Sequence, residues 1–153
     1  MGLAIGQKAP RFSLRNQHGE MVSLTDFRGE KNVVVLFYPY VFSSVCTVEL
    51  AEIRDNLADL KNDTSDVLAI SCDPMYSLRV FAERDRLAFS LLTDFWPHGA
   101  VAQAYGIFNE ELGCAGRATF VIDRRGLLRW RVWNQIPQAR DLGAYRKVLG
   151  ELA

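Results

Sequence analysis

The run NVVVLFY at residues 32–38 is the feature that most narrows the fold of this chain. It is short, rich in β-branched residues and almost wholly apolar, with charged residues before it and Pro39 after it. A strand with this composition has both faces buried, which is typical of a central strand in a sheet covered by helices on both sides. The run therefore predicts the central strand of an α/β layered protein.

Helical and strand patterns alternate along the rest of the chain. Residues 43–60 carry apolar side chains at spacings of three and four, with charged residues on the other face, which predicts a helix. Further strands are expected at 67–72, 88–94, 118–123 and 127–133, further helices at 75–87, 99–106 and 141–152, and a hairpin between RFSL and MVSL. This order predicts a mixed β-sheet flanked by helices, in a single domain over residues 1–153.

Charge and cysteine content exclude several classes of function. Lys plus Arg and Asp plus Glu number 18 each, so no basic field favours nucleic acid or an anionic membrane. No segment has the ~20 apolar residues of a membrane span, and a cytoplasmic protein is expected. The cysteines, Cys46, Cys72 and Cys114, are odd in number and lack metal-ligand spacing, and His18 and His98 lie far from them. We therefore expect neither a disulfide framework nor a metal or other cofactor.

Cys46 occupies a position in the predicted fold where a thiol can react. The strand ends near Tyr38 and the next helix begins near Ser43, so Cys46 falls in the first helical turn at the carboxyl end of a central strand. Unpaired N–H groups and the helix dipole favour a thiolate there. Ser43 or Ser44 can cap the helix, and one of these hydroxyls can donate to the sulfur or to an oxygen beside it. Pro39 can shape and shield the loop. From position alone, a cysteine that only packs remains an equal alternative.

Several motifs resemble those of one enzyme family. Pro39, Ser43 and Cys46 form P-x-x-x-S-x-x-C, which resembles the peroxidatic motif P-x-x-x-[TS]-x-x-C of peroxiredoxins. IGQKAPRFSL and GEMVSLTDFRG resemble the entry segment of that family, and RATFVIDRRG resembles the later strand that brings its active-site arginine, here Arg117. Residues 94–113 are similar to the one-cysteine alkyl hydroperoxide reductase E type. The resemblance covers nearly the whole chain and implies a thioredoxin-like fold.

The resemblance implies a thiol-dependent peroxidase that reduces hydrogen peroxide, organic hydroperoxides and peroxynitrite. Cys46 would attack a peroxide oxygen and become a sulfenic acid. The departing oxygen would be stabilised by the Ser43 hydroxyl, the Arg117 guanidinium and the backbone N–H groups of Val45 and Cys46. Arg117 would also hold the thiol ionised, and Glu49 would hold Arg117 by hydrogen bonding. Spacing alone, in contrast, favours a surface arginine and a solvated glutamate.

The route by which the sulfenic acid is reduced stays open. An external thiol is the simplest reductant, and the resemblance implies thioredoxin, or a low-molecular-weight thiol such as mycothiol with mycoredoxin or a glutaredoxin-like protein. A two-cysteine route would use Cys72, which closes a strand, or Cys114, which lies in the glycine-rich stretch LGCAGR, for which a mobile loop is expected. A homodimer is expected through loop residues near the site, namely Phe42, Phe95, Trp96, Pro97 and His98. His98 itself is expected to be structural.

Three other functions use the same sequence features. A peroxide sensor or redox relay would form the same sulfenic acid on Cys46 but turn over slowly. A disulfide oxidoreductase would need a second cysteine close by, and Glu49 occupies that position. A catalytically silent member of the fold would tolerate Cys46→Ser without loss of peroxide resistance.

Overall fold

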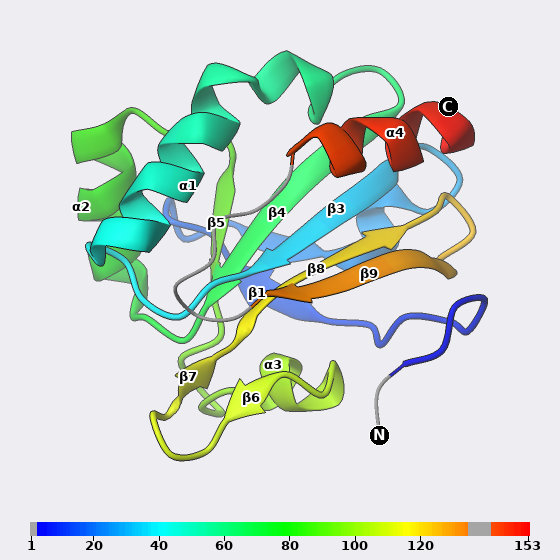
Figure 1. The fold of residues 1–153 in the computed structure, drawn as a ribbon. Helices are drawn as coiled ribbons and strands as arrows, with labels where there is room; N and C mark the ends of the chain where they lie inside the picture. The colour runs from blue at the N-terminus through cyan, green and yellow to red at the C-terminus, as the bar shows by residue number, and fades with distance from the viewer. Residues whose placement is uncertain (1–2, 135–141) are drawn as a thin grey trace.

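The sheet at the centre of the molecule is mixed, as the sequence predicts. The computed structural model describes residues 3–134 and 142–153. Its five-stranded sheet has the order β5-β4-β3-β8-β9 (Figure 1). The strands are β3 (Asn32–Phe37), β4 (Ser65–Ser71), β5 (Ser90–Thr93), β8 (Arg117–Ile122) and β9 (Leu128–Asn134). β3, β4 and β5 run parallel, whereas β8 is antiparallel to β3 and β9 to β8. All residues of β3 are buried, which confirms its central position.

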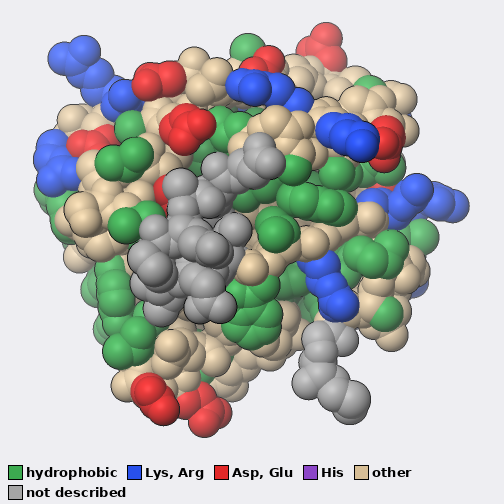
Figure 2. All heavy atoms as spheres, in the orientation of Figure 1, with side chains coloured by type: hydrophobic (Ala, Val, Ile, Leu, Met, Phe, Trp, Pro, Cys, Tyr) green, Lys and Arg blue, Asp and Glu red, His purple; other side chains and the backbone are tan. Residues whose placement is uncertain are grey.

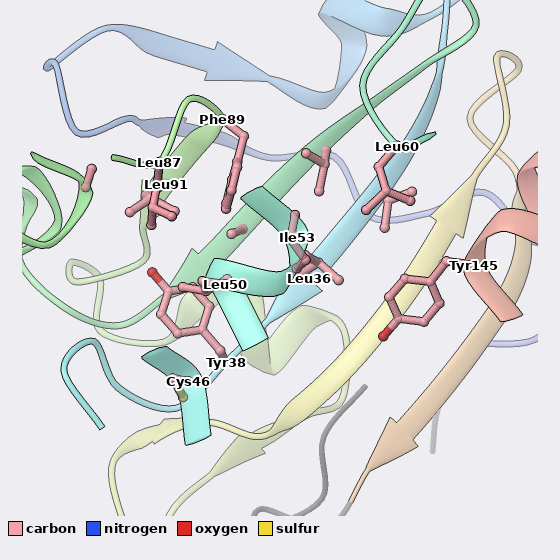
Figure 3. Packing of buried hydrophobic residues seen from close by; sticks show 14 of the residues in the cluster. Leu36, Tyr38, Cys46, Leu50, Ile53, Leu60, Leu87, Phe89, Leu91 and Tyr145 are labelled. Atoms are coloured by element: carbon pink, nitrogen blue, oxygen red, sulfur yellow. The ribbon is translucent and has the colours of Figure 1, made fainter. Parts of the chain in front are cut away.

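Helices cover the two faces of this sheet unequally. One core cluster joins the sheet to α1 (Ser44–Asp55), α2 (Met75–Asp85) and α4 (Leu142–Leu152), and Figure 3 shows Cys46, Leu50 and Ile53 of α1 within it. The other cluster joins the sheet to α3 (Ala100–Ala104) and to the N-terminal segment. Because side chains alternate along a strand, neighbouring residues of β3 and β8 serve opposite clusters.

Short hairpins complete the described fold. β1 (Ser13–Arg15) and β2 (Met21–Ser23) pair antiparallel, which confirms the N-terminal hairpin, and a 3-10 turn follows at Leu24–Phe27. β6 (Phe108–Asn109) pairs with β7 (Cys114–Ala115), a hairpin that the sequence pattern did not predict. Strands of two residues are too short to show an alternating pattern.

The predicted helix 43–60 is too long at its C-terminal end. α1 ends at Asp55, and a separate 3-10 turn covers Leu57–Asp59. Asn56 stands between them, and its side chain donates to the carbonyl oxygen of Glu52. Asparagine competes for backbone groups in this way and favours helix ends. The apolar pattern continues past Asp55 because Leu60 also packs in the core.

Charge on the surface is mixed in sign. Figure 2 shows Lys and Arg side chains interspersed with Asp and Glu along the upper edge of the face that it presents, with hydrophobic side chains between them. No helix in the described ranges is long and apolar enough to cross a membrane. The mixture of charges in Figure 2 agrees with the equal numbers of basic and acidic residues in the sequence.

Candidate active site

Cys46 lies where the sequence placed it, in the first turn of α1 beyond the end of β3. Ser43 is the N-cap of α1, and its Oγ accepts a hydrogen bond from the Cys46 N–H at 3.4 Å. The backbone of Ser43 is extended, as an N-cap requires. Pro39 is buried in the preceding loop, and Cys46 itself is buried. Val45 is half-buried in the same helical turn.

The Ser43 hydroxyl is not directed at the sulfur, which corrects one expectation from the sequence. The hydroxyl donates to the carbonyl oxygen of Tyr40 at 3.2 Å, and its oxygen accepts a hydrogen bond from the Cys46 N–H. A hydroxyl has one proton, so in this arrangement it cannot also donate to the thiol. Ser43 therefore organises the loop and the helix start, and the Cys46 N–H is engaged by this cap.

Arg117 reaches Cys46 because of the register between β3 and β8. Phe37 at the end of β3 stands opposite Ala118, so Arg117 lies just beyond the carboxyl end of β3. Its Nη2 donates to the Cys46 Sγ at 3.4 Å. The exposed fraction of Arg117 is only 1%, although arginine is normally a surface residue. The guanidinium and the thiol, which the sequence only proposed to be neighbours, are thus in contact.

Glu49 is the second partner of Arg117. Its Oε1 accepts a hydrogen bond from Arg117 Nη1, and the two side chains form a buried ion pair. Glu49 and Cys46 are three residues apart in α1 and so share one helix face. A planar guanidinium can contact both groups at once through separate nitrogens, which a single ammonium cannot. The guanidinium thus joins the sulfur and the carboxylate in one buried cluster.

Cys72 lies in different surroundings from Cys46. Cys72 packs in the second core cluster, on the opposite face of the sheet from Cys46. Burial, with a contribution from the charge of Asp94, raises the pKa of the Cys72 thiol to about 12. All three cysteines carry free thiols.

Cys114 corrects a second expectation, because it does not lie in a mobile loop. It forms β7 with Ala115 and is buried. Burial raises the pKa of the Cys114 thiol, and a hydrogen bond with Tyr40 partly opposes this rise. Sulfur that is buried, protonated and held in a strand is a poor nucleophile until the local structure opens.

Two residues of the site escaped sequence reasoning. Asp73, which follows β4, accepts a hydrogen bond from the Val41 N–H at 3.0 Å and anchors the loop before Ser43. Its place after the strand next to β3 was a usable signal, since parallel strands end at one edge of a sheet. Tyr40 carries the carbonyl that Ser43 contacts, and no pattern marked it.

His98 links the loop at 94–99 to the β6–β7 turn. His98 is placed between two carbonyl oxygens, with Nδ1 3.0 Å from that of Phe95 and Nε2 2.7 Å from that of Gly113. This agrees with the structural role expected for His98. Trp96 is the most exposed of the large apolar side chains among the described residues, at 81%.

Comparisons with known proteins point to one family. A family model described as AhpC/TSA matches residues 5–131. Alkyl hydroperoxide reductase E of Mycobacterium tuberculosis is 44% identical over 150 residues, which cover 98% of each chain. Peroxiredoxin Bcp of Escherichia coli is 43% identical over 109 residues, 71% of this chain and 68% of that protein. The crystal structure of Enterococcus faecalis AhpC has a TM-score of 0.88 at 27% identity, over 99% of this chain and 92% of that one.

These likenesses confirm the thioredoxin-like α/β fold expected from the sequence. They also agree with the resemblance carried by Pro39, Ser43 and Cys46 and by the strand of Arg117. The chain therefore belongs to the AhpC/TSA family of peroxiredoxins and is a thiol-dependent peroxidase.

Proposed function

We propose that Cys46 is the peroxidatic nucleophile and that Arg117 is the residue that activates both the thiol and the peroxide. The observation that carries this proposal is the contact between Arg117 Nη2 and Cys46 Sγ, at 3.4 Å in a buried site. A cation donating to sulfur stabilises negative charge on it, and the thiolate is the reactive form. Glu49 acts as a positioning residue, because it holds the other side of the guanidinium.

The proposed step transfers one oxygen to sulfur. The Cys46 thiolate attacks the terminal oxygen of a hydroperoxide, so an S–O bond forms while the O–O bond breaks. Sulfur loses two electrons and becomes a sulfenic acid, and the peroxide gains them. The leaving alkoxide or hydroxide takes up the proton that the thiol released and departs as alcohol or water. Arg117 stands beside the sulfur, where it can stabilise the leaving oxygen as charge develops.

The surrounding residues support this step through placement. Ser43 caps α1 and fixes the loop through the Tyr40 carbonyl. Buried Pro39 closes the loop against solvent, and the Val45 N–H in the same helical turn is the backbone donor proposed for the peroxide. Hydrogen peroxide, organic hydroperoxides and peroxynitrite are the proposed substrates.

An external thiol is the proposed reductant of the sulfenic acid. Two equivalents of thiol restore Cys46 and yield one disulfide and one water. The placement of Cys72 across the sheet and the burial of Cys114 favour this one-cysteine route. Mycothiol with mycoredoxin is the first pair to assay, and thioredoxin and a glutaredoxin-like protein follow. We further propose a cytoplasmic homodimer that uses the exposed apolar loop residues, among them Phe42, Phe95 and Trp96.

Intact-mass measurement tests this function directly. Reduced protein receives one equivalent of hydrogen peroxide or cumene hydroperoxide, with a sulfenic-acid trap in a parallel sample. Gain of one oxygen that is trapped in the wild type, but not in Cys46→Ser, is expected. Loss of two hydrogens without trapping would instead mean an internal disulfide, and Cys114→Ser and Cys72→Ser would show which thiol forms it. A Cys46→Ser variant that consumes peroxide like the wild type would refute the proposal.

Steady turnover separates the peroxidase from a sensor. Continuous peroxide consumption with a low-molecular-weight thiol or a redoxin is expected. A single rapid oxidation without turnover by any of these reductants would favour the redox relay.

A further inference from the structure

Tyr40 joins two parts of the site that are far apart in the sequence. It follows Pro39 in the loop between β3 and α1, and its side chain reaches the turn between β6 and β7. Its hydroxyl donates to the carbonyl oxygen of Leu112 at 3.2 Å. The same hydroxyl is hydrogen-bonded with the Cys114 thiol, a contact that, together with burial, raises the pKa of Tyr40 to about 12. Because a hydroxyl has one proton, the Leu112 carbonyl oxygen and the Cys114 sulfur share the Tyr40 hydroxyl as their donor.

On the loop side, Tyr40 is linked to Cys46 through Ser43. The Tyr40 carbonyl accepts from Ser43 Oγ at 3.2 Å, and that oxygen accepts from the Cys46 N–H at 3.4 Å. A shift of Tyr40 therefore moves the acceptor that orients the Ser43 hydroxyl, and with it the cap of α1.

On the strand side, Tyr40 is linked to Arg117. Cys114 belongs to β7, and Gly116, which donates to the carbonyl oxygen of Ile107 at 2.7 Å, connects β7 to β8. Figure 1 shows β7 leading directly into β8, which begins at Arg117. Arg117 returns to Cys46 through the 3.4 Å contact with its sulfur. These contacts close a ring around the proposed reaction centre, and Tyr40 is the side chain that bridges its two halves.

We propose that Tyr40 is a positioning residue of the peroxidase reaction, whose hydroxyl holds the loop of Ser43 and the strand of Arg117 in register around Cys46. This inference rests on the function proposed above for Cys46 and Arg117. Tyr40 is 40% exposed, so its ring is not a core element, and removing the hydroxyl alone leaves the packing in place. A misplacement of about 1 Å between reacting groups can lower a rate by about 100-fold, so a single hydrogen-bonding group is enough to matter.

Tyr40→Phe tests the proposal, with Tyr76→Phe as the matched control. Tyr76 is 68% exposed on α2, and the Arg79 guanidinium lies 5.3 Å from the centre of its ring, a contact that phenylalanine preserves. The first measurement is the second-order rate of Cys46 oxidation by hydrogen peroxide in a single turnover. The second is the rate at which N-ethylmaleimide alkylates Cys114, located by peptide mass. Tyr40→Phe should slow the oxidation by about 3- to 30-fold. It should speed the alkylation by about tenfold, because loss of the bond to Leu112 lets the turn that buries Cys114 open more often, and Tyr76→Phe should change neither rate.

A double-mutant cycle distinguishes positioning from a general structural effect. If Tyr40 acts through Arg117, then Tyr40→Phe should cost little further rate in an Arg117→Lys background, because coupled residues are not additive. An equal loss in both backgrounds, or a Tyr40→Phe oxidation rate within twofold of the wild type, would overturn the proposal. A wild-type protein that forms no sulfenic acid would overturn the proposed function as well. If the wild type forms the sulfenic acid and Tyr40→Phe is oxidised at the same rate, only the proposed role of Tyr40 is refuted.

Discussion

Arg117→Lys separates the contact of Arg117 with Cys46 from its contact with Glu49. The guanidinium uses Nη2 for the Cys46 sulfur and Nη1 for Glu49. Lysine keeps the positive charge, but its single nitrogen cannot occupy both positions. Since Glu49 is a buried carboxylate, the ammonium should remain with it and leave the sulfur. The variant should therefore fold and lose most of its reactivity toward peroxide.

The size of this loss follows from the contact that is removed. A hydrogen bond to a charged group contributes about 1.5–3 kcal/mol, and each 1.36 kcal/mol is about tenfold in rate. We therefore expect the second-order rate constant for oxidation of Cys46 to fall by about 10- to 150-fold. Stability should fall less than in Arg117→Met, where loss of the cation from the buried ion pair with Glu49 costs about 3–5 kcal/mol. That larger loss is a substantial share of the roughly 5–15 kcal/mol typical of a domain.

Single-turnover oxidation is the appropriate assay, because it needs no reductant. Reduced protein is mixed with limiting hydrogen peroxide, quenched at intervals and analysed for residual peroxide, and urea unfolding gives the stability. Arg54→Lys is the control, since Arg54 lies on the same helix, pairs with exposed Asp55, and should leave the rate unchanged. A folded Arg117→Lys variant that reacts within twofold of the wild type would refute the proposed activation by Arg117.

Two further predictions concern stability. Gly99 has a φ of +71°, and a Cβ there would clash with the ring of Phe108, so Gly99→Ala should lower the free energy of unfolding by about 2 kcal/mol or more. Gly150 lies in α4 with nothing within 4 Å of an added Cβ, so Gly150→Ala should raise the free energy of unfolding by about 0.5–1 kcal/mol. Thermal melts that shift in the same direction for Gly99→Ala and Gly150→Ala would contradict this pair of predictions. The pKa of the Cys72 thiol is raised to about 12 in the folded protein, whereas an unfolded cysteine loses its proton near pH 8.5. Above about pH 8.5 the unfolded chain therefore binds fewer protons than the folded one, and the free energy of unfolding should fall by up to about 1.4 kcal/mol per pH unit. Urea melts at pH 7.5 and 10 should show a smaller fall for Cys72→Ala, and an equal fall in both proteins would count against a buried, protonated thiol.

The central strand and the start of the helix at Cys46 could be predicted because local sequence determines them. An unbroken apolar run needs burial on both faces, and a serine before a helical pattern is a strong N-cap signal. The β6–β7 hairpin could not be predicted in the same way. Its strands have two residues each, and Cys114 is buried there by contacts with distant segments rather than by any local pattern.

The contact partners of Cys46 lay beyond local reasoning altogether. Arg117 and Glu49 are residue types that composition assigns to the surface, and both are buried because each neutralises the other. Only the resemblance of RATFVIDRRG to a known strand indicated Arg117. The orientation of the Ser43 hydroxyl depended on a carbonyl three residues earlier, which a motif does not specify.

If Arg117 activates Cys46 as proposed, the antiparallel pairing of β3 with β8 also sets when the thiol becomes reactive. Cys46 and Arg117 are separated by 71 residues, so the ribosome completes the strand of Arg117 long after β3 and α1 have been made. A chain that has folded only its first half carries Cys46 and Glu49 without the guanidinium that joins them. Contacts between such distant segments also form late, because closing a long loop costs entropy before it gains contacts. Fast reaction with peroxide should therefore mark a fully synthesised and folded chain, and nascent chains should escape oxidation at Cys46.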